Sequence, residues 1–220
     1  MKREEVCACI KEIGILPSVR VNTQELARFA AETVYSSGIP IVEITLTVPG
    51  ALGVINDLAS RYPDMAVGAG TVLDDEAARR CVDAGARFLT SPGLVLEVVA
   101  YARKVDVAVL PGALTPTEII AAWKAGADFV KIFPTSYVGG IQYVRALKVP
   151  LPQIALVATG GVNQLTAADF ILAGATAIGL GGELLPMEAL HFRQGDRIQE
   201  LAGRFLSMVK DARALRETYY

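Results

Sequence analysis

A short pattern recurs four times along the chain: a helical run ends on a small residue and a glycine, and a β-rich segment follows at once. The copies read SSGIPIVEI, DAGARFLTS, KAGADFVKI and LAGATAIGL, with glycines at Gly38, Gly85, Gly126 and Gly174. A glycine directly after a helix adopts the left-handed backbone that turns the chain into a strand. The pattern therefore predicts a series of helix-to-strand connections.

Between these copies the sequence has room for one more strand and helix, supplied at MAVGAG, VAVLPG and IALVATGG. Four double units make eight strands, expected near 15–20, 40–46, 65–70, 87–90, 107–111, 128–133, 154–158 and 176–180. Helices are expected near 3–13, 23–37, 50–61, 74–84, 94–104, 115–125, 138–148, 164–173 and 194–215. Helix N-caps are expected at Thr23, Asp74, Thr115 and Asn163, each before an apolar-periodic run.

Alternating strands and helices favour a parallel sheet, and eight of each favour an α/β fold of the (β/α)8 TIM-barrel type with an extra N-terminal helix. An open doubly wound sheet is the alternative, although no G-x-G-x-x-G follows the first strand. The length of 220 residues and 52% hydrophobic content suit one core, so a single domain over 1–220 is expected.

Composition narrows the class of partner. The net charge is −2 without a basic run, which argues against nucleic-acid binding. No apolar stretch is long enough to span a bilayer, and acids interrupt the N-terminal segment, so a cytoplasmic protein is expected. Cys7, Cys9 and Cys81 are expected to be free thiols, because the spacing of the first two suits a zinc site poorly.

Lys131 is the principal candidate for chemistry. By the period-two rule it shares a strand face with Phe129 and Phe133. If that face lines the barrel interior, desolvation favours the neutral amine, which is the form that attacks a carbonyl. The alternative is an outward-facing lysine that snorkels along a helix.

Glu43 repeats this logic on the second strand, where it shares a face with Ile41, Thr45 and Thr47. An inward carboxylate is costly unless it is paired or used, so it is a candidate general base. A structural partnership with Arg20 or Lys131 is compatible with that role.

Other strand ends suggest a binding cavity. Thr71 in GAGT offers a hydroxyl, and Pro92 lies in a turn that could form a wall. The glycine-rich ends TGG at 159–161 and GLGG at 179–182 are typical of a phosphate site on backbone N–H groups and a helix N-terminus. His191, Trp123 and Tyr101 are interpreted as surface or packing residues.

Together these motifs resemble the 2-keto-3-deoxy-6-phosphogluconate (KDPG) and 4-hydroxy-2-oxoglutarate (KHG) aldolase family. The resemblance covers nearly the whole chain through VR at 19–20, VEITL at 42–46, GAGTVL at 68–73, SPG at 91–93, FVKIFP at 129–134, TGG at 159–161 and GLGGELL at 179–185. It implies a homotrimer in carbohydrate metabolism that acts without a metal or other cofactor.

The resemblance also implies roles for individual residues. Lys131 would form a Schiff base with pyruvate and Glu43 would transfer protons, while the pyruvyl group would be seated by Thr71 and Pro92. The remaining implied binding residues are Arg20, Thr47, Phe133, Gly160, Gly161, Gly182 and Glu183. Two of them depart from the gluconate-type pattern: Thr47 replaces an arginine and Glu183 replaces a serine. The galactonate-type (KDPGal) relatives are more similar at both positions.

The predicted function is therefore class I cleavage of a 2-keto-3-deoxy-6-phospho sugar acid, KDPG or KDPGal, to pyruvate and glyceraldehyde 3-phosphate. One alternative is a phosphosugar isomerase or epimerase that uses Glu43 as its base. Another is a barrel that binds a phosphometabolite without catalysis, because fold alone does not fix function.

Overall fold

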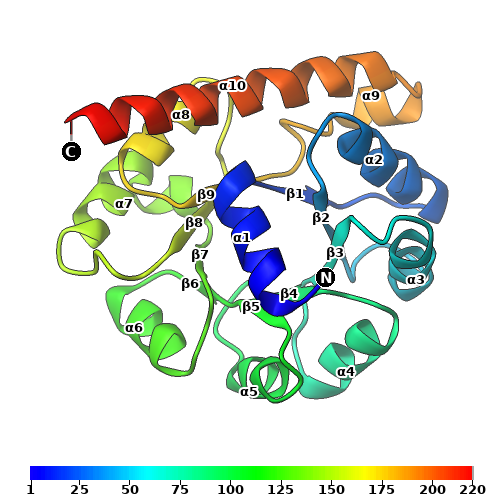
Figure 1. Ribbon diagram of the computed structural model, residues 1–220, viewed down its shortest axis with the longest axis horizontal. Helices are drawn as coiled ribbons and strands as arrows, with labels where there is room; N and C mark the ends of the chain where they lie inside the picture. The colour runs from blue at the N-terminus through cyan, green and yellow to red at the C-terminus, as the bar shows by residue number, and fades with distance from the viewer. Residues whose placement is uncertain (220) are drawn as a thin grey trace.

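The computed structural model describes residues 1–219, so Tyr220, the last residue of the predicted domain, lies outside it. A parallel sheet curls into a barrel and helices surround it (Figure 1). The strands are β1 (Ile15–Val19), β2 (Ile41–Thr45), β3 (Ala66–Gly70), β4 (Phe88–Thr90), β5 (Ala108–Leu110), β6 (Gly112–Ala113), β7 (Val130–Ile132), β8 (Leu156–Thr159) and β9 (Ala177–Leu180). The helices are α1 (Arg3–Ile13), α2 (Gln24–Ser36), α3 (Ala51–Arg61), α4 (Asp75–Asp83), α5 (Leu96–Lys104), α6 (Pro116–Lys124), α7 (Gly140–Lys148), α8 (Ala167–Leu172), α9 (Met187–His191) and α10 (Gly195–Tyr219).

The sheet has the order β5-β4-β3-β2-β1-β9-β8-β7-β6, and its two outer strands are consecutive pieces of chain on either side of Pro111. Proline has no N–H to donate to a ladder, which explains why β5 of the predicted strand 107–111 ends before Pro111 and a further piece, β6, follows it. The Pro111 carbonyl still accepts a hydrogen bond from Lys131 N at 2.9 Å, and Ala113 O accepts one from Phe133 N at 3.2 Å. These bonds close the ring, so the predicted eight-stranded barrel is confirmed.

Strand register decides which side chains face the interior. Ser18 is the register partner of Glu43, and Lys131 is the partner of Gly112 on one side and Val157 on the other. The neighbours of Lys131 on its own strand, Val130 and Ile132, belong to a separate buried cluster with residues of α6 and α7. Lys131 therefore points into the barrel, as the period-two rule predicts.

The N-terminal ends of the strands are covered by α1, which lies across the barrel in Figure 1. Arg3 forms an ion pair with Asp128 just before β7, with 2.7 Å between Nη2 and Oδ1. The other oxygen of Asp128 accepts a hydrogen bond from Val109 N at 3.0 Å. The added helix thus closes the end of the barrel opposite the strand C-termini.

The expected helix N-caps are confirmed at three of four positions. Thr23, Asp74 and Thr115 each accept a hydrogen bond from a backbone N–H in the first turn of α2, α4 and α6. The prediction for Asn163 is wrong for α8, which begins at Ala167. Asn163 Oδ1 instead accepts from Leu165 N at 2.9 Å, so it stabilises a turn that precedes the helix.

Three further segments differ from expectation. The helix predicted at 138–148 begins at Gly140 after a 3-10 turn at Thr135–Val138, because Gly139 and Gly140 have positive φ. The five-residue α9 was not predicted, since one turn is too short to show a period. The last helix extends beyond its predicted end to Tyr219 and lies along α8 and α2 (Figure 1). None of the helices within residues 1–219 is long and apolar enough to cross a membrane.

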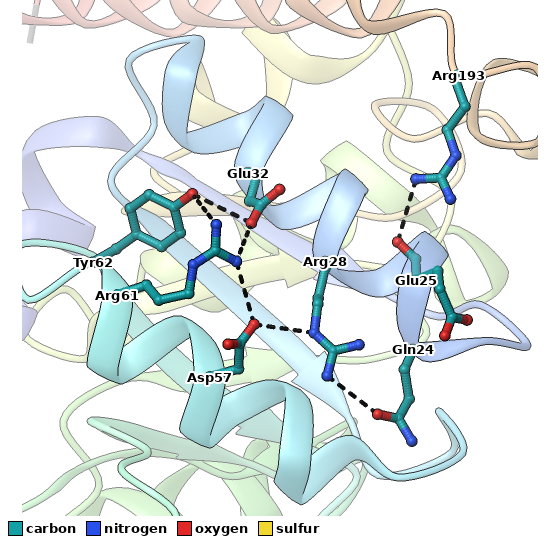
Figure 2. A network of polar contacts seen from close by, with 8 residues as sticks. All are labelled: Gln24, Glu25, Arg28, Glu32, Asp57, Arg61, Tyr62 and Arg193. Atoms are coloured by element: carbon teal, nitrogen blue, oxygen red, sulfur yellow. Dashed lines mark hydrogen bonds and ion pairs between the residues drawn. The ribbon is translucent and has the colours of Figure 1, made fainter.

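Helices α2 and α3 are joined on their outer surface by a network of charged side chains (Figure 2). Asp57 accepts from Arg28 Nε at 3.0 Å and lies 3.4 Å from Arg61 Nη1. The same atom of Arg61 lies 2.7 Å from Glu32 Oε1, and Tyr62 also contacts Glu32. This network fixes two helices that follow neighbouring strands of the barrel.

Candidate active site

A cavity of about 470 Å³ opens at the carboxyl-terminal ends of the strands. Residues from β1, β7, β8 and β9 form its walls together with the loops that follow β3, β4, β8 and β9. Barrel proteins carry their chemistry at this end of the sheet, because the loops there can vary without disturbing the core. The cavity is therefore the place to look for reactive groups.

Lys131 lines the cavity from the middle of β7 and is only 8% exposed. Its Nζ atom lies 5.5 Å from the centre of the Phe133 ring, and the aromatic face attracts the ammonium. A lysine placed so deep is exceptional, because long charged side chains usually reach solvent. The structure thus presents a buried amine at the wall of an open cavity.

Glu43 supplies the opposite charge. Its carboxylate is 2% exposed, and Oε2 lies 3.8 Å from Lys131 Nζ. Ser18 Oγ donates to Oε1 and Thr90 Oγ1 donates to Oε2, both at 2.7 Å. Glu43 is not among the residues that line the cavity, so it lies just behind the wall that Ser18 and Lys131 form.

Gly70 at the end of β3 makes this arrangement possible. A Cβ atom at that position would run into Oε1 and the terminal carbons of the Glu43 side chain. Buried packing leaves no room for such an overlap. The glycine of the GAGT motif is therefore required by the carboxylate beside it.

Thr71, the next residue, lines the cavity with a φ of 61°. A β-branched residue seldom adopts this left-handed conformation, so the backbone there is strained. Hydrogen bonds on either side hold it, with Leu46 N donating to Gly70 O at 2.8 Å and Val72 N donating to Thr90 O at 3.0 Å. The strained backbone places a threonine at the cavity wall, after the strand next to the one that precedes Pro92.

The far part of the cavity is bordered by glycine turns. Gly160 and Gly161 have φ of 89° and 86°, and Gly182 and Glu183 come from the loop after β9. Neither turn leads directly into a helix, since α8 begins at 167 and α9 at 187. The expectation of a helix N-terminus at these turns is therefore wrong. At these turns only the backbone N–H groups of the turns themselves are available to bind an anion.

Arg20 and Thr47 lie at the margin. Arg20 is exposed and lines the cavity after the end of β1. Thr47 is also exposed, but it borders an adjacent hollow that shares Arg20, Val21 and Met187 with the main cavity. Its hydroxyl lies 2.8 Å from that of Thr45. Of the predicted binding residues, Thr47 is the one that the structure separates from the cavity.

Several lining residues were not predicted. Ser18 and Thr159 bring hydroxyls to the wall, and among residues 1–219 the buried Thr159 Oγ1 has no hydrogen-bond partner. The others are apolar side chains: Val21, Val162, Leu180, Leu185, Met187 and Leu190. Thr159 stands directly before a glycine pair at a strand end, which is the signal that could have identified it.

The comparisons with known proteins agree with this geometry. The family model described as KDPG and KHG aldolase matches residues 6–201. The chain belongs to the KDPG and KHG aldolase family. The aldolase is 31% identical to the KHG/KDPG aldolase of Escherichia coli K12 over 189 residues, which are 86% of this chain and 88% of that protein. It is 34% identical to the 2-dehydro-3-deoxy-6-phosphogalactonate aldolase of the same strain, over 90% and 94% of the two chains.

A solved structure extends the likeness to three dimensions. The KDPG aldolase of Legionella pneumophila, with pyruvate captured at low pH as a covalent carbinolamine intermediate, superimposes with a TM-score of 0.83. It is 29% identical and covers 89% of this chain and 95% of its own. The protein is therefore an aldolase, a carbon–carbon lyase, rather than an isomerase or a barrel without catalysis.

The remaining candidate residues of the aldolase lie away from the cavity. His191 is exposed on α9, and Trp123 is 43% exposed on α6. The thiols are free, and burial raises the pKa of Cys9 and Cys81 to about 11. Within residues 1–219, no group of three or more histidine, cysteine, aspartate or glutamate side chains is arranged to hold a metal ion.

Proposed function

We propose that the aldolase cleaves a 2-keto-3-deoxy-6-phospho sugar acid, KDPG or KDPGal, to pyruvate and glyceraldehyde 3-phosphate through a Schiff base at Lys131. The observation that carries this proposal is the buried pair at the cavity wall, with 3.8 Å between Lys131 Nζ and Glu43 Oε2. A buried lysine beside a carboxylate is costly for folding and rarely retained without a use. In an aldolase, amine chemistry provides that use.

The chemistry begins when the neutral amine of Lys131 attacks the keto carbon. The resulting carbinolamine loses water and leaves an iminium ion at C2, which draws electrons from the bond between C3 and the hydroxyl-bearing C4. That bond breaks as Glu43 accepts the proton of the substrate hydroxyl, releasing the aldehyde and leaving an enamine. Return of a proton to the enamine carbon, followed by hydrolysis, releases pyruvate and frees Lys131.

The cavity walls suit the two ends of such a substrate. Thr71 and Pro92 border the space near Lys131, where the pyruvyl group is expected to lie. The phosphate is expected at the other end, on the N–H groups of the turns that contain Gly160, Gly161 and Gly182. Glu183 lies at this end and is exposed, so solvent screens its repulsion of a phosphate.

The Schiff base can be tested directly. The protein is incubated with pyruvate, reduced with borohydride and digested, and the adduct is located by mass spectrometry. The adduct is expected on Lys131. Lys148 is the internal control, because it is a half-buried amine whose Nζ donates to the carbonyls of Pro152 and Ile154 at 2.8 Å. An unmodified Lys131 would refute the imine mechanism.

Substrate choice needs a second experiment. Cleavage of the gluconate and galactonate epimers is compared, each with and without its 6-phosphate, by coupling pyruvate release to a reductase. The proposal expects turnover of at least one phosphorylated epimer and a lower kcat/KM for its unphosphorylated form. Equal kcat/KM with and without phosphate would remove the distal phosphate from the proposal.

We further propose that the aldolase is a cytoplasmic homotrimer. Support for self-association comes from Leu73 and Leu96, which are 55% and 57% exposed in the segments that follow β3 and β4. Exposed apolar side chains near one another at the surface favour burial against another chain. Light scattering after size-exclusion chromatography would test this, with three times the chain mass of 23.4 kDa as the expected result.

A further inference from the structure

Two hydroxyl groups hold the carboxylate of Glu43 from opposite sides of its strand. Ser18 comes from β1 and Thr90 from β4, and each donates to a different carboxylate oxygen at 2.7 Å. We call these two residues the hydroxyl clamp. Because each oxygen has its own donor, rotation of the carboxylate would break both hydrogen bonds at once.

Thr90 is fully buried, so an apolar side chain would serve the core there as well, whereas Ser18 is half-buried and lines the cavity. Ser18 shares its strand face with Leu16, which is 2% exposed, and Thr90 shares its face with Phe88, which is fully buried. A buried hydroxyl contributes less to the hydrophobic core than a valine of the same shape. What these hydroxyls supply instead is a pair of donors for a carboxylate removed from water.

Glu43 and the amine lie close together without a direct hydrogen bond. A lysine and a carboxylate that bond directly approach to about 2.7 to 2.9 Å, whereas Lys131 Nζ and Glu43 Oε2 remain 3.8 Å apart. Thr90 donates to the same oxygen, Oε2, at 2.7 Å. The amine is thus left beside a base without being tied to it.

We propose that Ser18 and Thr90 are positioning residues for proton transfer by Glu43. This inference rests on the proposed function, because it assigns the clamp to the proton steps that follow imine formation. Thr90 holds Oε2, the oxygen 3.8 Å from Lys131 Nζ, and Ser18 holds Oε1, so that proton transfer requires no reorganisation of the carboxylate. Ser18 also connects the carboxylate with the cavity, because Ser18 lines the cavity and Glu43 does not.

The test separates proton transfer from imine formation by using pyruvate alone. Exchange of the methyl protons of pyruvate with deuterated solvent, followed by NMR, reports enamine formation. Borohydride trapping at its end point reports the imine. Thr90→Val and Ser18→Ala are each expected to slow exchange roughly tenfold, with the extent of trapping unchanged. Thr90→Ser keeps the donor and is expected to exchange at close to the wild-type rate.

Two controls distinguish positioning from general damage. Thr45 is also fully buried on an inward position, but its hydroxyl donates to Val19 O instead of to Glu43. Thr45→Val is therefore expected to leave exchange unchanged. In a Glu43→Gln background, adding Thr90→Val is expected to cause no further loss, because the group that the clamp positions is already neutral.

The outcomes for the two proposals differ. Absence of trapping in the wild-type protein would refute the Schiff base itself. Trapping and exchange at wild-type rates in both Thr90→Val and Ser18→Ala would overturn the clamp alone. The clamp would also be overturned if Thr90→Val slowed exchange equally with and without Glu43, or if Thr90→Ser were as slow as Thr90→Val.

Discussion

Gly70 on β3 lies directly against the carboxylate of Glu43 on β2, at a point where a methyl group would overlap Oε1. Gly70→Ala is therefore expected to displace the carboxylate from the hydroxyl clamp. We expect a loss of about 1 to 3 kcal/mol in the free energy of unfolding and a fall in kcat of about 100-fold. Urea denaturation and a cleavage assay would measure the two effects.

The control for that substitution is Gly203→Ala. Gly203 lies within α10, and a Cβ there would meet nothing within 4 Å. An added methyl should stabilise the helix by about 0.5 to 1 kcal/mol, because alanine loses less backbone entropy than glycine. Activity should not change. Equal effects of the two substitutions would show that Gly70 has no special relation to Glu43.

Glu43→Gln removes the carboxylate and keeps its size. Lys131 should still be trapped with pyruvate, because imine formation needs the amine first. Cleavage should fall by about 100-fold or more, since general acid–base catalysis contributes factors of this order. The comparison variant is Glu97→Gln on the exposed surface of α5, which should cleave normally. Full activity of Glu43→Gln would remove Glu43 from the proton steps.

Asp57 contacts two arginines between α2 and α3 (Figure 2). Its carboxylate is about one third exposed, at 32%, so the pairs are screened by water and salt. Asp57→Asn is expected to lower the free energy of unfolding by about 0.5 to 1 kcal/mol at low salt and by less at high salt. Denaturation at two ionic strengths would measure this. Asp64→Asn is the control, since the exposed Asp64 has no ion pair among the described residues.

The thiols should be inert in the folded protein. Burial raises the pKa of Cys81 from its ordinary 9.0 to about 11, so the reactive thiolate is scarce at neutral pH. Iodoacetamide at pH 7.5 should label the native protein slowly and the denatured protein quickly.

The same shift makes stability depend on pH. Because the Cys81 thiol keeps its proton more tightly in the folded state, it stabilises the fold below about pH 9, and that contribution is lost between pH 9 and about 11. A thermal-unfolding series across that range would show the loss.

Much of the architecture could be predicted because it depends on the alternation of side chains along strands and on glycines in the turns between helices and strands. Gly38, Gly85, Gly126 and Gly174 all have positive φ, which only a glycine adopts without strain, and each leads into a strand. The inward position of Lys131 follows from strict alternation along β7. These features are local or repeated, so a sequence displays them directly.

What could not be predicted depends on contacts between distant segments. Ser18 and Thr90 appear in sequence as small hydroxyl residues on apolar strands, and only the barrel brings both to Glu43. Met187 reaches the cavity from the start of a five-residue helix, too short to show a period. Thr47 is four residues after Glu43, so alternation along a strand would put both side chains on the same face. However, β2 ends at Thr45, and beyond that point alternation no longer determines where a side chain points.

Thr71 allows function to be separated from stability. Its φ of 61° is unfavourable for a β-branched side chain, by about 1 kcal/mol or more. Thr71→Gly should relieve that strain, and the gain is partly offset by the greater chain entropy of glycine in the unfolded state. A net stabilisation of up to about 1 kcal/mol is therefore expected.

The same change removes a hydroxyl from the cavity wall, so KM for the keto acid should rise. Thr71→Ser keeps the hydroxyl and should retain KM near the wild-type value. If Thr71→Gly were less stable and equally active, the strain at this position would have no connection with substrate binding, and the hydroxyl would have no part in seating the pyruvyl group.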